Sequence, residues 1–144
     1  MKASIFFQAS CVAISGRGIL ISGAVGSGKS SLALGLIDRG AELVGDDGVL
    51  LEQKSGQLIA TAHPETLGLI EVRNLGLLTL PFIAQTQIAL HITLDMSAPR
   101  FITEAEHIEL YGVLIPKIGL WPQSPILPIK AELALQHYGL KCGP

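Results

Sequence analysis

The chain has 144 residues, of which 49% are hydrophobic and 15% charged, and its net charge at pH 7 is −2. This composition excludes a disordered chain and provides no basic surface for nucleic acid or an anionic membrane. The length is that of one ordinary domain and no repeat or linker divides it, so we expect residues 1–144 to form a single domain. Because no stretch approaches the ~20 apolar residues that span a bilayer, we expect a cytoplasmic protein.

Short apolar runs rich in β-branched and aromatic residues predict strands in the first third of the chain. In chain order these strands are expected over residues 4–9, 11–15, 18–22 and 41–47. A helix is expected before the last of them, over residues 29–40, because Leu32 and Leu36 recur at helical spacing. Gly40 then occupies the position of a C-terminal helix cap.

The rest of the chain predicts a hairpin, further strands and a closing helix. Residues 48–53 and 57–62 resemble a β-hairpin joined through Lys-Ser-Gly, and residues 86–95 alternate as a strand does. Two short strands are expected within residues 108–120, and a helix over residues 129–138. Together these elements predict an α/β fold with a mainly parallel central sheet and added antiparallel hairpins.

The sequence Gly-Ala-Val-Gly-Ser-Gly-Lys-Ser, residues 23–30, matches the phosphate-binding pattern G-x-x-x-x-G-K-[ST] without a mismatch. Its glycines let successive backbone N–H groups turn towards phosphate oxygens, and the following helix adds its positive dipole end. Lys29 can reach the β- and γ-phosphates and the Ser30 hydroxyl can bind magnesium, so ATP and Mg²⁺ are the expected cofactors. The residues expected to contact the nucleotide are Gly23, Ala24, Val25, Gly26, Ser27, Gly28, Lys29, Ser30 and Ser31.

Asp46 and Asp47 end the strand that follows this helix, at the edge of the sheet that faces a ligand in such folds. One carboxylate there can help to hold magnesium, and the other can serve as a general base towards an attacking hydroxyl. The alternative is a solvated Asp-Asp-Gly turn. Glu71 and Arg73 share a face if residues 68–78 form a strand, and they either pair at the surface or line the phosphate crevice, with Glu71 on the metal.

The succession of residues 23–47, 67–78 and 109–118 resembles the catalytic domain of HPr kinase/phosphorylase, in particular the short form without a separate N-terminal domain. Residues 70–76, Ile-Glu-Val-Arg-Asn-Leu-Gly, correspond to a signature of that family. The resemblance covers essentially the whole chain and implies a P-loop kinase domain of the HPr kinase/phosphoenolpyruvate carboxykinase-like type.

The activity that the resemblance implies is that of a serine kinase using Mg-ATP. Its substrate would be the phosphocarrier HPr or the nitrogen-branch relative of HPr, and the modification would regulate phosphotransferase-system signalling and carbon and nitrogen metabolism. In the family the modification is reversed by phosphorolysis, which releases pyrophosphate. The resemblance also implies a homohexamer.

The resemblance assigns catalytic and binding roles to individual residues of this chain. Lys29 is implied as the P-loop lysine, and Ser30 and Glu71 as magnesium ligands. Asp47 would act as the base in phosphorylation and as the acid in the reverse reaction, with Asp46 beside it.

Two arginines also match the family, and three other positions depart from it. Arg73 belongs to the signature, and Arg100 matches the family's catalytic arginine. Gln8 stands where the family usually has a catalytic histidine, and an amide does not relay a proton. Gly48 stands where an arginine commonly follows the aspartate pair, and Asn74 replaces a signature glycine.

Residues 121–128 read Trp-Pro-Gln-Ser-Pro-Ile-Leu-Pro, without the arginines that the family often places there for phosphorolysis. Together with Gln8, this loop favours a kinase with little or no reverse activity. A small-molecule kinase is an alternative, although such enzymes usually close an arginine-rich lid over the phosphates and the arginines here are dispersed. A nucleotide-binding regulator that has lost turnover is the other alternative, and Gln8 is the feature that favours it.

Overall fold

The structure, a computed structural model, describes residues 4–142. The helices among these residues are α1 (Lys29–Asp38) and α2 (Leu127–Tyr138). The strands, in chain order, are β1 (Ile5–Phe7), β2 (Ser10–Ile14), β3 (Arg17–Gly23), β4 (Glu42–Gly45), β5 (Val49–Lys54), β6 (Gln57–Ala62), β7 (Leu69–Val72), β8 (Gly76–Thr79), β9 (Gln85–Leu94), β10 (Glu106–Leu110) and β11 (Val113–Leu120). The helices and strands expected from the sequence are present within a few residues of their expected bounds.

Strand β9 is the centre of a nine-stranded mixed sheet. Strand β3 pairs parallel along one edge of β9. The other edge is shared, because β6 pairs antiparallel with residues 85–87 and β11 pairs parallel with residues 91–94. From β3 the sheet continues to β2 and β4, and from β6 it continues to β5 and β1, while β10 pairs with β11. Parallel pairing is thus confined to β3, β9 and β11, so the parallel part is narrower than the sequence led us to expect.

Three two-residue turns explain why so much of the sheet is antiparallel. The turns Ser15–Gly16, Ser55–Gly56 and Tyr111–Gly112 have positive φ at both residues, and each joins two strands that pair antiparallel. This conformation matches the natural twist of a tight hairpin. The turn at Ser15–Gly16 makes β2 and β3 a hairpin, although only the β5–β6 hairpin was expected as such from the sequence.

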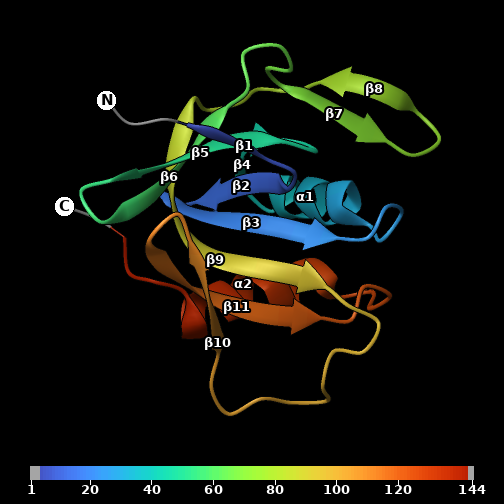
Figure 1. Cartoon of the computed structure of the whole chain (residues 1–144). Helices are drawn as coiled ribbons and strands as arrows, with labels where there is room; N and C mark the ends of the chain where they lie inside the picture. The colour runs from blue at the N-terminus through green and yellow to red at the C-terminus, as the bar shows by residue number, and fades with distance from the viewer. Residues whose placement is uncertain (1–3, 143–144) are drawn as a thin grey trace.

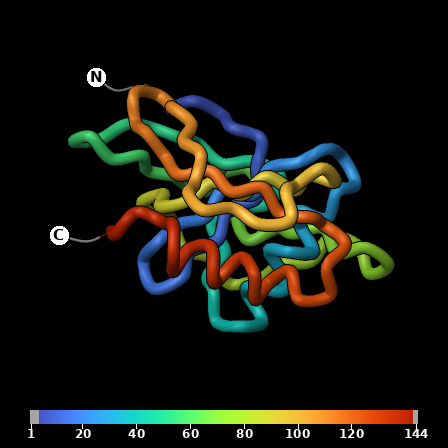
Figure 2. Tube along the Cα trace, turned by 90° about the horizontal axis from the view of Figure 1, so that it is seen from below, coloured from blue at the N-terminus to red at the C-terminus, as the bar shows by residue number. Residues whose placement is uncertain are grey.

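The sheet has a core on each face. Ile19 and Ile21 of β3 point towards the helices, whereas Leu20 between them joins the core on the opposite face, because side chains alternate along a strand. Figure 1 shows both helices on one face of β3, β9 and β11, and the turned view in Figure 2 places α2 (red) along that side. On the other face, the β5–β6 and β10–β11 hairpins contribute to the second core. Both cores hold β3 in place, and β3 leads directly into the P-loop.

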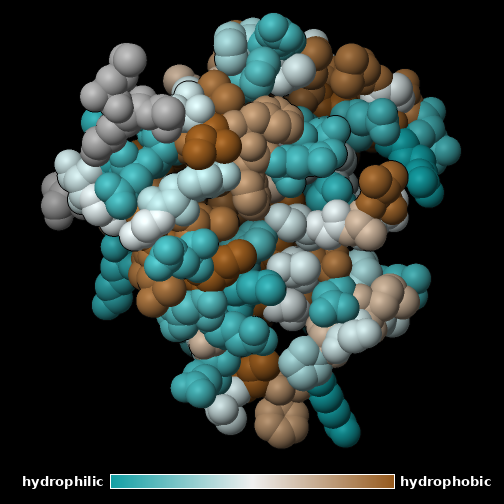
Figure 3. All heavy atoms as spheres, viewed as in Figure 1, coloured by the Kyte–Doolittle hydropathy of each residue, from teal (hydrophilic) through white to brown (hydrophobic). Residues whose placement is uncertain are grey.

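A separate two-stranded sheet, β7–β8, projects from the body near α1 (Figure 1). Ile70 of β7 is fully buried in the core under the helices, which anchors the hairpin. Its far end is exposed and mixed, with Leu75 at 71% and Leu77 at 64% exposure beside the exposed Arg73 and Asn74, and Figure 3 shows brown and teal spheres together at the upper right. Among the described residues, neither helix has the length and hydropathy to cross a membrane.

Candidate functional site

The P-loop, residues 23–30, connects the end of β3 to the start of α1. Gly26 and Gly28 have φ values of 79° and 103°, a left-handed conformation that glycine adopts without strain. Gly28 is the N-cap of α1 and no side chain caps the helix, so the first N–H groups are available to an anion. Gly23 is needed for space, because a Cβ there would lie 2.5 Å from Ser27 Oγ. The loop therefore brings its backbone close to any bound phosphate.

Asp46, directly after β4, connects this loop to the neighbouring strands. Ser30 Oγ donates a hydrogen bond to Asp46 Oδ1 at 2.7 Å, and Ser10 Oγ donates to the same oxygen at 2.9 Å. The backbone N–H of Glu71 donates to Asp46 Oδ2 at 3.1 Å. These three bonds fix the carboxylate beside the Ser30 hydroxyl, and both groups supply the oxygen ligands that Mg²⁺ prefers. Sequence reasoning missed Ser10, which only the pairing of β2 with β4 brings to this place.

Asp47 occupies the mouth of the same cleft and is exposed, unlike the half-buried Asp46. Its φ is 62°, a left-handed value that Asp and Asn tolerate better than other non-glycine residues. Gln8 Nε2 donates a hydrogen bond of 3.4 Å to Asp47 Oδ1. The two neighbouring carboxylates therefore differ, because Asp46 is held by three donors and Asp47 has one long bond and access to solvent.

Lys29, Glu71 and Arg73 complete the charged lining of the cleft. Lys29 Nζ donates to the Gly23 carbonyl oxygen at 3.0 Å, so the side chain lies folded back along the loop. Glu71 and Arg73 were expected on one face of a strand, but β7 ends at Val72 and Arg73 lies in the turn that follows. No ion pair joins Glu71 to Arg73 within the described part of the chain. They line the crevice, as one of the two sequence interpretations proposed.

The cleft has a volume of about 340 Å³ and is lined by Gln8, residues 25–31 of the P-loop and α1, Asp46, Asp47, Glu71 and Arg73. Three carboxylates and two cations give it a formal charge of −1. A polyphosphate would meet net repulsion there unless a divalent cation accompanied it. Within residues 4–142 no three His, Cys, Asp or Glu side chains are placed to hold a metal together. A magnesium ion at Ser30 and Asp46 would therefore complete its shell with phosphate oxygens and water, as it commonly does.

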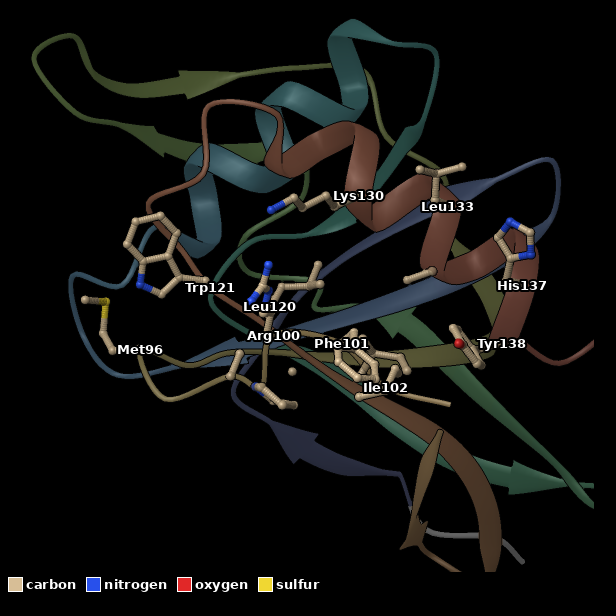
Figure 4. Close-up of a pocket in the computed structure, with 15 residues that line it drawn as sticks. Met96, Arg100, Phe101, Ile102, Leu120, Trp121, Lys130, Leu133, His137 and Tyr138 are labelled. Carbon is tan, nitrogen blue, oxygen red and sulfur yellow. The ribbon is translucent and has the colours of Figure 1, made fainter. Parts of the chain in front are cut away.

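Not every residue expected at the site lines this cleft. Gly23 and Ala24 lie at the base of the loop, outside the lining. Arg100 lies elsewhere, in a second hollow between α2 and the segment after β9, which Figure 4 shows in close-up. The structure therefore brings Lys29 together with both aspartates and leaves Arg100 apart from them.

Two departures from the family pattern have a structural reason. A Cβ at Gly48 would lie 2.5 Å from the ring of Phe6, so in this chain Phe6 occupies the space that a side chain at position 48 would need. The ring of Phe6 also packs edge-on against His63, with centroids 5.9 Å apart. Asn74 has φ of 76°, and asparagine is the residue that best replaces glycine in that conformation. The backbone of the signature turn is therefore compatible with the Asn74 replacement.

A buried histidine beside the P-loop strand was also missed by sequence reasoning. His91 of β9 is 5% exposed, and its Nε2 shares a hydrogen bond of 2.7 Å with Ser22 Oγ of β3. Burial, helped by the positive charge of Lys117 on β11, lowers the pKa of His91 to about 4. His91 is therefore neutral at pH 7, and its Nδ1 has no hydrogen-bond partner in the described structure. The sequence pattern of β9 did not single out His91, because one histidine within an apolar strand follows the same pattern as the other core residues.

The strand, loop and helix around the cleft define a P-loop, the phosphate-binding element of nucleotide-dependent enzymes. Comparison with known proteins narrows this class. The family model for the HPr Serine kinase C-terminal domain matches residues 1–121. The chain therefore belongs to the HPr serine kinase C-terminal domain family.

Individual relatives agree with this assignment. The chain is 33% identical to the HPr kinase/phosphorylase of Clostridium novyi (strain NT), with 91% of this chain and 48% of that protein covered. Identity to the HPr kinase/phosphorylase of Clostridium acetobutylicum is 35%, with coverage of 90% and 47%. The chain thus spans about half the length of these curated relatives. A solved structure, the Hpr(Ser) kinase/phosphatase from Coxiella burnetii, superposes with a TM-score of 0.82 at 28% identity, covering 92% of this chain and 94% of that one.

Proposed function

We propose that the protein transfers the γ-phosphoryl group of Mg-ATP to a serine hydroxyl of an HPr-like phosphocarrier protein. The observation that carries the proposal is the pair of aspartates at the P-loop. Asp46 is bonded to the Ser30 hydroxyl at 2.7 Å, and Asp47 is exposed at the mouth of the cleft beside it. This arrangement supports a role for Asp46 towards a metal and for Asp47 towards a substrate that approaches from solvent. The names of the relatives support HPr as the substrate.

The P-loop would hold the phosphates of the nucleotide through its backbone. The N–H groups of the loop and of the first turn of α1 would donate to phosphate oxygens, helped by the helix dipole. Lys29, which donates to the Gly23 carbonyl oxygen, would turn to pair with the β- and γ-phosphates. Arg73, exposed at the rim of the cleft and without an ion pair among the described residues, would add a second positive charge near the transferred group.

Ser30, Asp46 and Glu71 would hold magnesium. When bound, the metal neutralises charge that develops on the phosphates. Ser30 offers its hydroxyl oxygen, and Asp46 offers the carboxylate to which that hydroxyl now donates. Glu71 donates its backbone N–H to this carboxylate, and within residues 4–142 its side chain forms no ion pair, so the side chain would be available to the metal or to the water around it.

Asp47 would take the proton of the attacking serine as general base. It is exposed and is held by a single long hydrogen bond from Gln8, so a hydroxyl of a docked protein can approach it directly. Gln8 would orient the carboxylate without carrying charge. A carboxylate alone is sufficient for the forward reaction, because only one proton leaves the nucleophile.

The reverse reaction would be much weaker in this protein. Phosphorolysis brings inorganic phosphate beside a phosphoserine, and two anions repel unless extra cations offset them. The cations among the described residues that line the cleft are Lys29 and Arg73, and Gln8 adds no charge. Lys130 lines the second hollow and Lys117 lies on β11 opposite His91, so neither belongs to the lining of the cleft. We therefore propose a kinase with little or no phosphorolysis.

The proposed activity implies a cell compartment for the protein. A kinase that uses ATP and a phosphocarrier belongs in the cytoplasm, and the free thiols of Cys11 and Cys142 are compatible with a reducing compartment. The homohexamer implied by the family resemblance stays a prediction.

The test is the intact mass of an HPr protein incubated with the enzyme and Mg-ATP. One added phosphate on the carrier is expected with the parental protein and none with Lys29→Ala. Lys54→Ala is the matched control, because Lys54 is an exposed lysine at the turn between β5 and β6. A carrier whose mass stays unchanged with the parental protein would contradict the proposal, and would favour a small-molecule kinase if ATP is still consumed when candidate metabolites are supplied.

A further inference from the structure

A second hollow, which we call the α2 pocket, lies on the helical side of the sheet. It is enclosed by the segment 96–102 after β9, by residues 118–121 at the end of β11, and by the outer face of α2 over residues 130–138. Its volume is about 610 Å³, within the range of sites for small organic molecules. The α2 pocket shares no lining residue with the P-loop cleft.

The wall of the α2 pocket is apolar and contains aromatic rings. Ile102, Leu120 and Leu133 supply aliphatic surface, and Figure 4 shows Phe101 beside Ile102 towards the Tyr138 end of the hollow and Trp121 at the opposite end. Phe101 is 78% exposed and Trp121 is 44% exposed. Two large rings left in water at one concave site indicate a surface that gains free energy when an apolar group covers it.

The charged side chains that line the α2 pocket, Arg100 and Lys130, are both cations. Arg100 and Lys130 come from opposite walls, and Figure 4 shows their charged ends directed into the same space. His137 lies further along α2. Among the described residues no carboxylate lines the pocket, and the ion pair found within residues 4–142 joins Glu132 of α2 to Arg39 at the end of α1 rather than to either of these cations.

We propose that the α2 pocket binds an organic anion with an apolar body, such as a medium-length chain or a ring that carries a carboxylate or a phosphate. Arg100 and Lys130 would pair with the anionic head, because charge-assisted hydrogen bonds to Arg and Lys are strong and directional. The apolar body would cover Phe101, Leu133 and Trp121. An anion also relieves the repulsion between the two cations, which a neutral ligand does not.

The α2 pocket and the P-loop cleft lie at the same edge of the sheet. Parallel strands β3, β9 and β11 all end there, and the pocket wall begins at Met96, two residues after β9 ends at Leu94. Leu94 pairs in register with Gly23, the first glycine of the P-loop. The proposed ligand site therefore begins just after β9, the strand that pairs with β3 below the P-loop. Binding of the proposed anion requires neither nucleotide nor the carrier protein.

Trp121 is the chain's only tryptophan and lines the pocket, so its fluorescence reports occupancy without any enzyme assay. The full chain is titrated with octanoate and octyl phosphate, each below its critical micelle concentration, and with octan-1-ol below its solubility limit. Saturable changes are expected with both anions, and at least about tenfold weaker binding with the alcohol, because it forms no charge-assisted bond. Equal affinity for the alcohol would overturn the proposal, as would no saturable change with either anion.

Variants separate the two parts of the site. Arg100→Gln with Lys130→Gln should weaken both anions at least about tenfold and leave the alcohol unchanged. Lys54→Gln is the matched control, because Lys54 lies on the β5–β6 hairpin outside the pocket, and it should change nothing. Circular dichroism checks that each variant is folded. Unchanged anion affinity in the double variant would overturn the proposal. So would Trp121 emission that shifts with protein concentration alone, because a second copy of the chain would then cover the pocket.

Discussion

The P-loop cleft and the α2 pocket differ in what makes them. The cleft is polar, and seven of its twelve lining residues belong to one continuous segment, residues 25–31, between a strand and the first turn of a helix. The α2 pocket is largely apolar and is assembled from side chains of three separate segments, within residues 96–102, 118–121 and 130–138. The cleft is consequently sensitive to single atoms in its backbone, whereas the pocket depends on which side chains surround it.

The two hollows also treat charge differently. The cleft is lined by both carboxylates and cations, and the Asp46 carboxylate accepts three hydrogen bonds from the protein itself. In the α2 pocket, Arg100 and Lys130 have no acidic partner in the lining. The P-loop cleft, with its net negative charge, therefore needs a metal ion to bind a polyphosphate, whereas the positively charged α2 pocket can bind an anion without one. The predictions below test this contrast, from the largest expected effect to the smallest.

Asp47→Asn is expected to have the largest effect on transfer. Loss of a positioned general base typically lowers the rate by ~10²–10⁴-fold, because the serine keeps its proton as the bond to phosphorus forms. The nucleotide should bind as before, since the side-chain hydrogen bond of Asp47 among the described residues is with Gln8 and not with the P-loop. Initial rates of carrier phosphorylation and equilibrium nucleotide binding are measured side by side. A variant with the parental rate would remove Asp47 from the mechanism.

His91, buried beside β3, predicts that the free energy of unfolding depends on pH. Below pH 6.5 the unfolded chain protonates His91, whereas the folded protein does so only near pH 4, so stability falls as pH drops through this window. The loss is on the order of 3 kcal/mol, since one pKa unit corresponds to about 1.4 kcal/mol. His91→Gln should remove this part of the dependence.

The groups around His91 that bear on this prediction are Ser22, Phe7 and the cation Lys117. Denaturant unfolding of the parental chain and of His91→Gln is followed between pH 7 and pH 4. His137→Gln is the matched control, because His137 is exposed on α2 and its replacement should leave the slope unchanged. If the free energy of unfolding of His91→Gln depends on pH as steeply as that of the parental chain, the account of the buried imidazole is wrong.

A pair of glycines tests the contrast between the two hollows with the same substitution. In Gly23→Ala, the new Cβ would lie 2.5 Å from the buried Ser27 Oγ, so the loop must shift, at a cost of about 1–3 kcal/mol and with weaker nucleotide binding. In Gly119→Ala, in the α2 pocket, the nearest atom would be 3.8 Å away, an ordinary contact. Thermal unfolding and nucleotide titration of both variants are compared. Equal effects would show that the cleft is no more sensitive to its backbone than the pocket.

The smallest effect is expected in the turn after β7. Asn74→Ala should destabilise the protein by about 1 kcal/mol, because alanine is strained at φ of 76°. Asn74→Gly should be neutral or slightly stabilising, since glycine adopts this conformation freely. The midpoints of denaturant unfolding separate the two variants. A larger loss with glycine than with alanine would mean that the Asn74 side chain, and not its backbone, maintains the turn.

The P-loop was predictable because its chemistry requires glycine, lysine and a hydroxyl at fixed local spacing. Asp46 and Asp47 were predictable because they end the strand next along the chain. The sequence did not separate their roles, which depend on the long-range contacts of Asp46 with Ser10 and with the Glu71 backbone. Arg100 lines the α2 pocket instead of the cleft because the segment after β9 packs beside α2, and no local sequence pattern records that direction. The α2 pocket was missed for the same reason.

Calorimetric titration with Mg-ATP is the most direct test of the central claim, that the P-loop cleft is the nucleotide site. The account predicts saturable binding to the parental chain, weaker binding without magnesium, and loss of binding in Lys29→Ala. Lys130→Gln removes a lysine from the α2 pocket instead and should bind as the parental chain does. Undiminished binding to Lys29→Ala, or loss of binding in Lys130→Gln, would contradict the account.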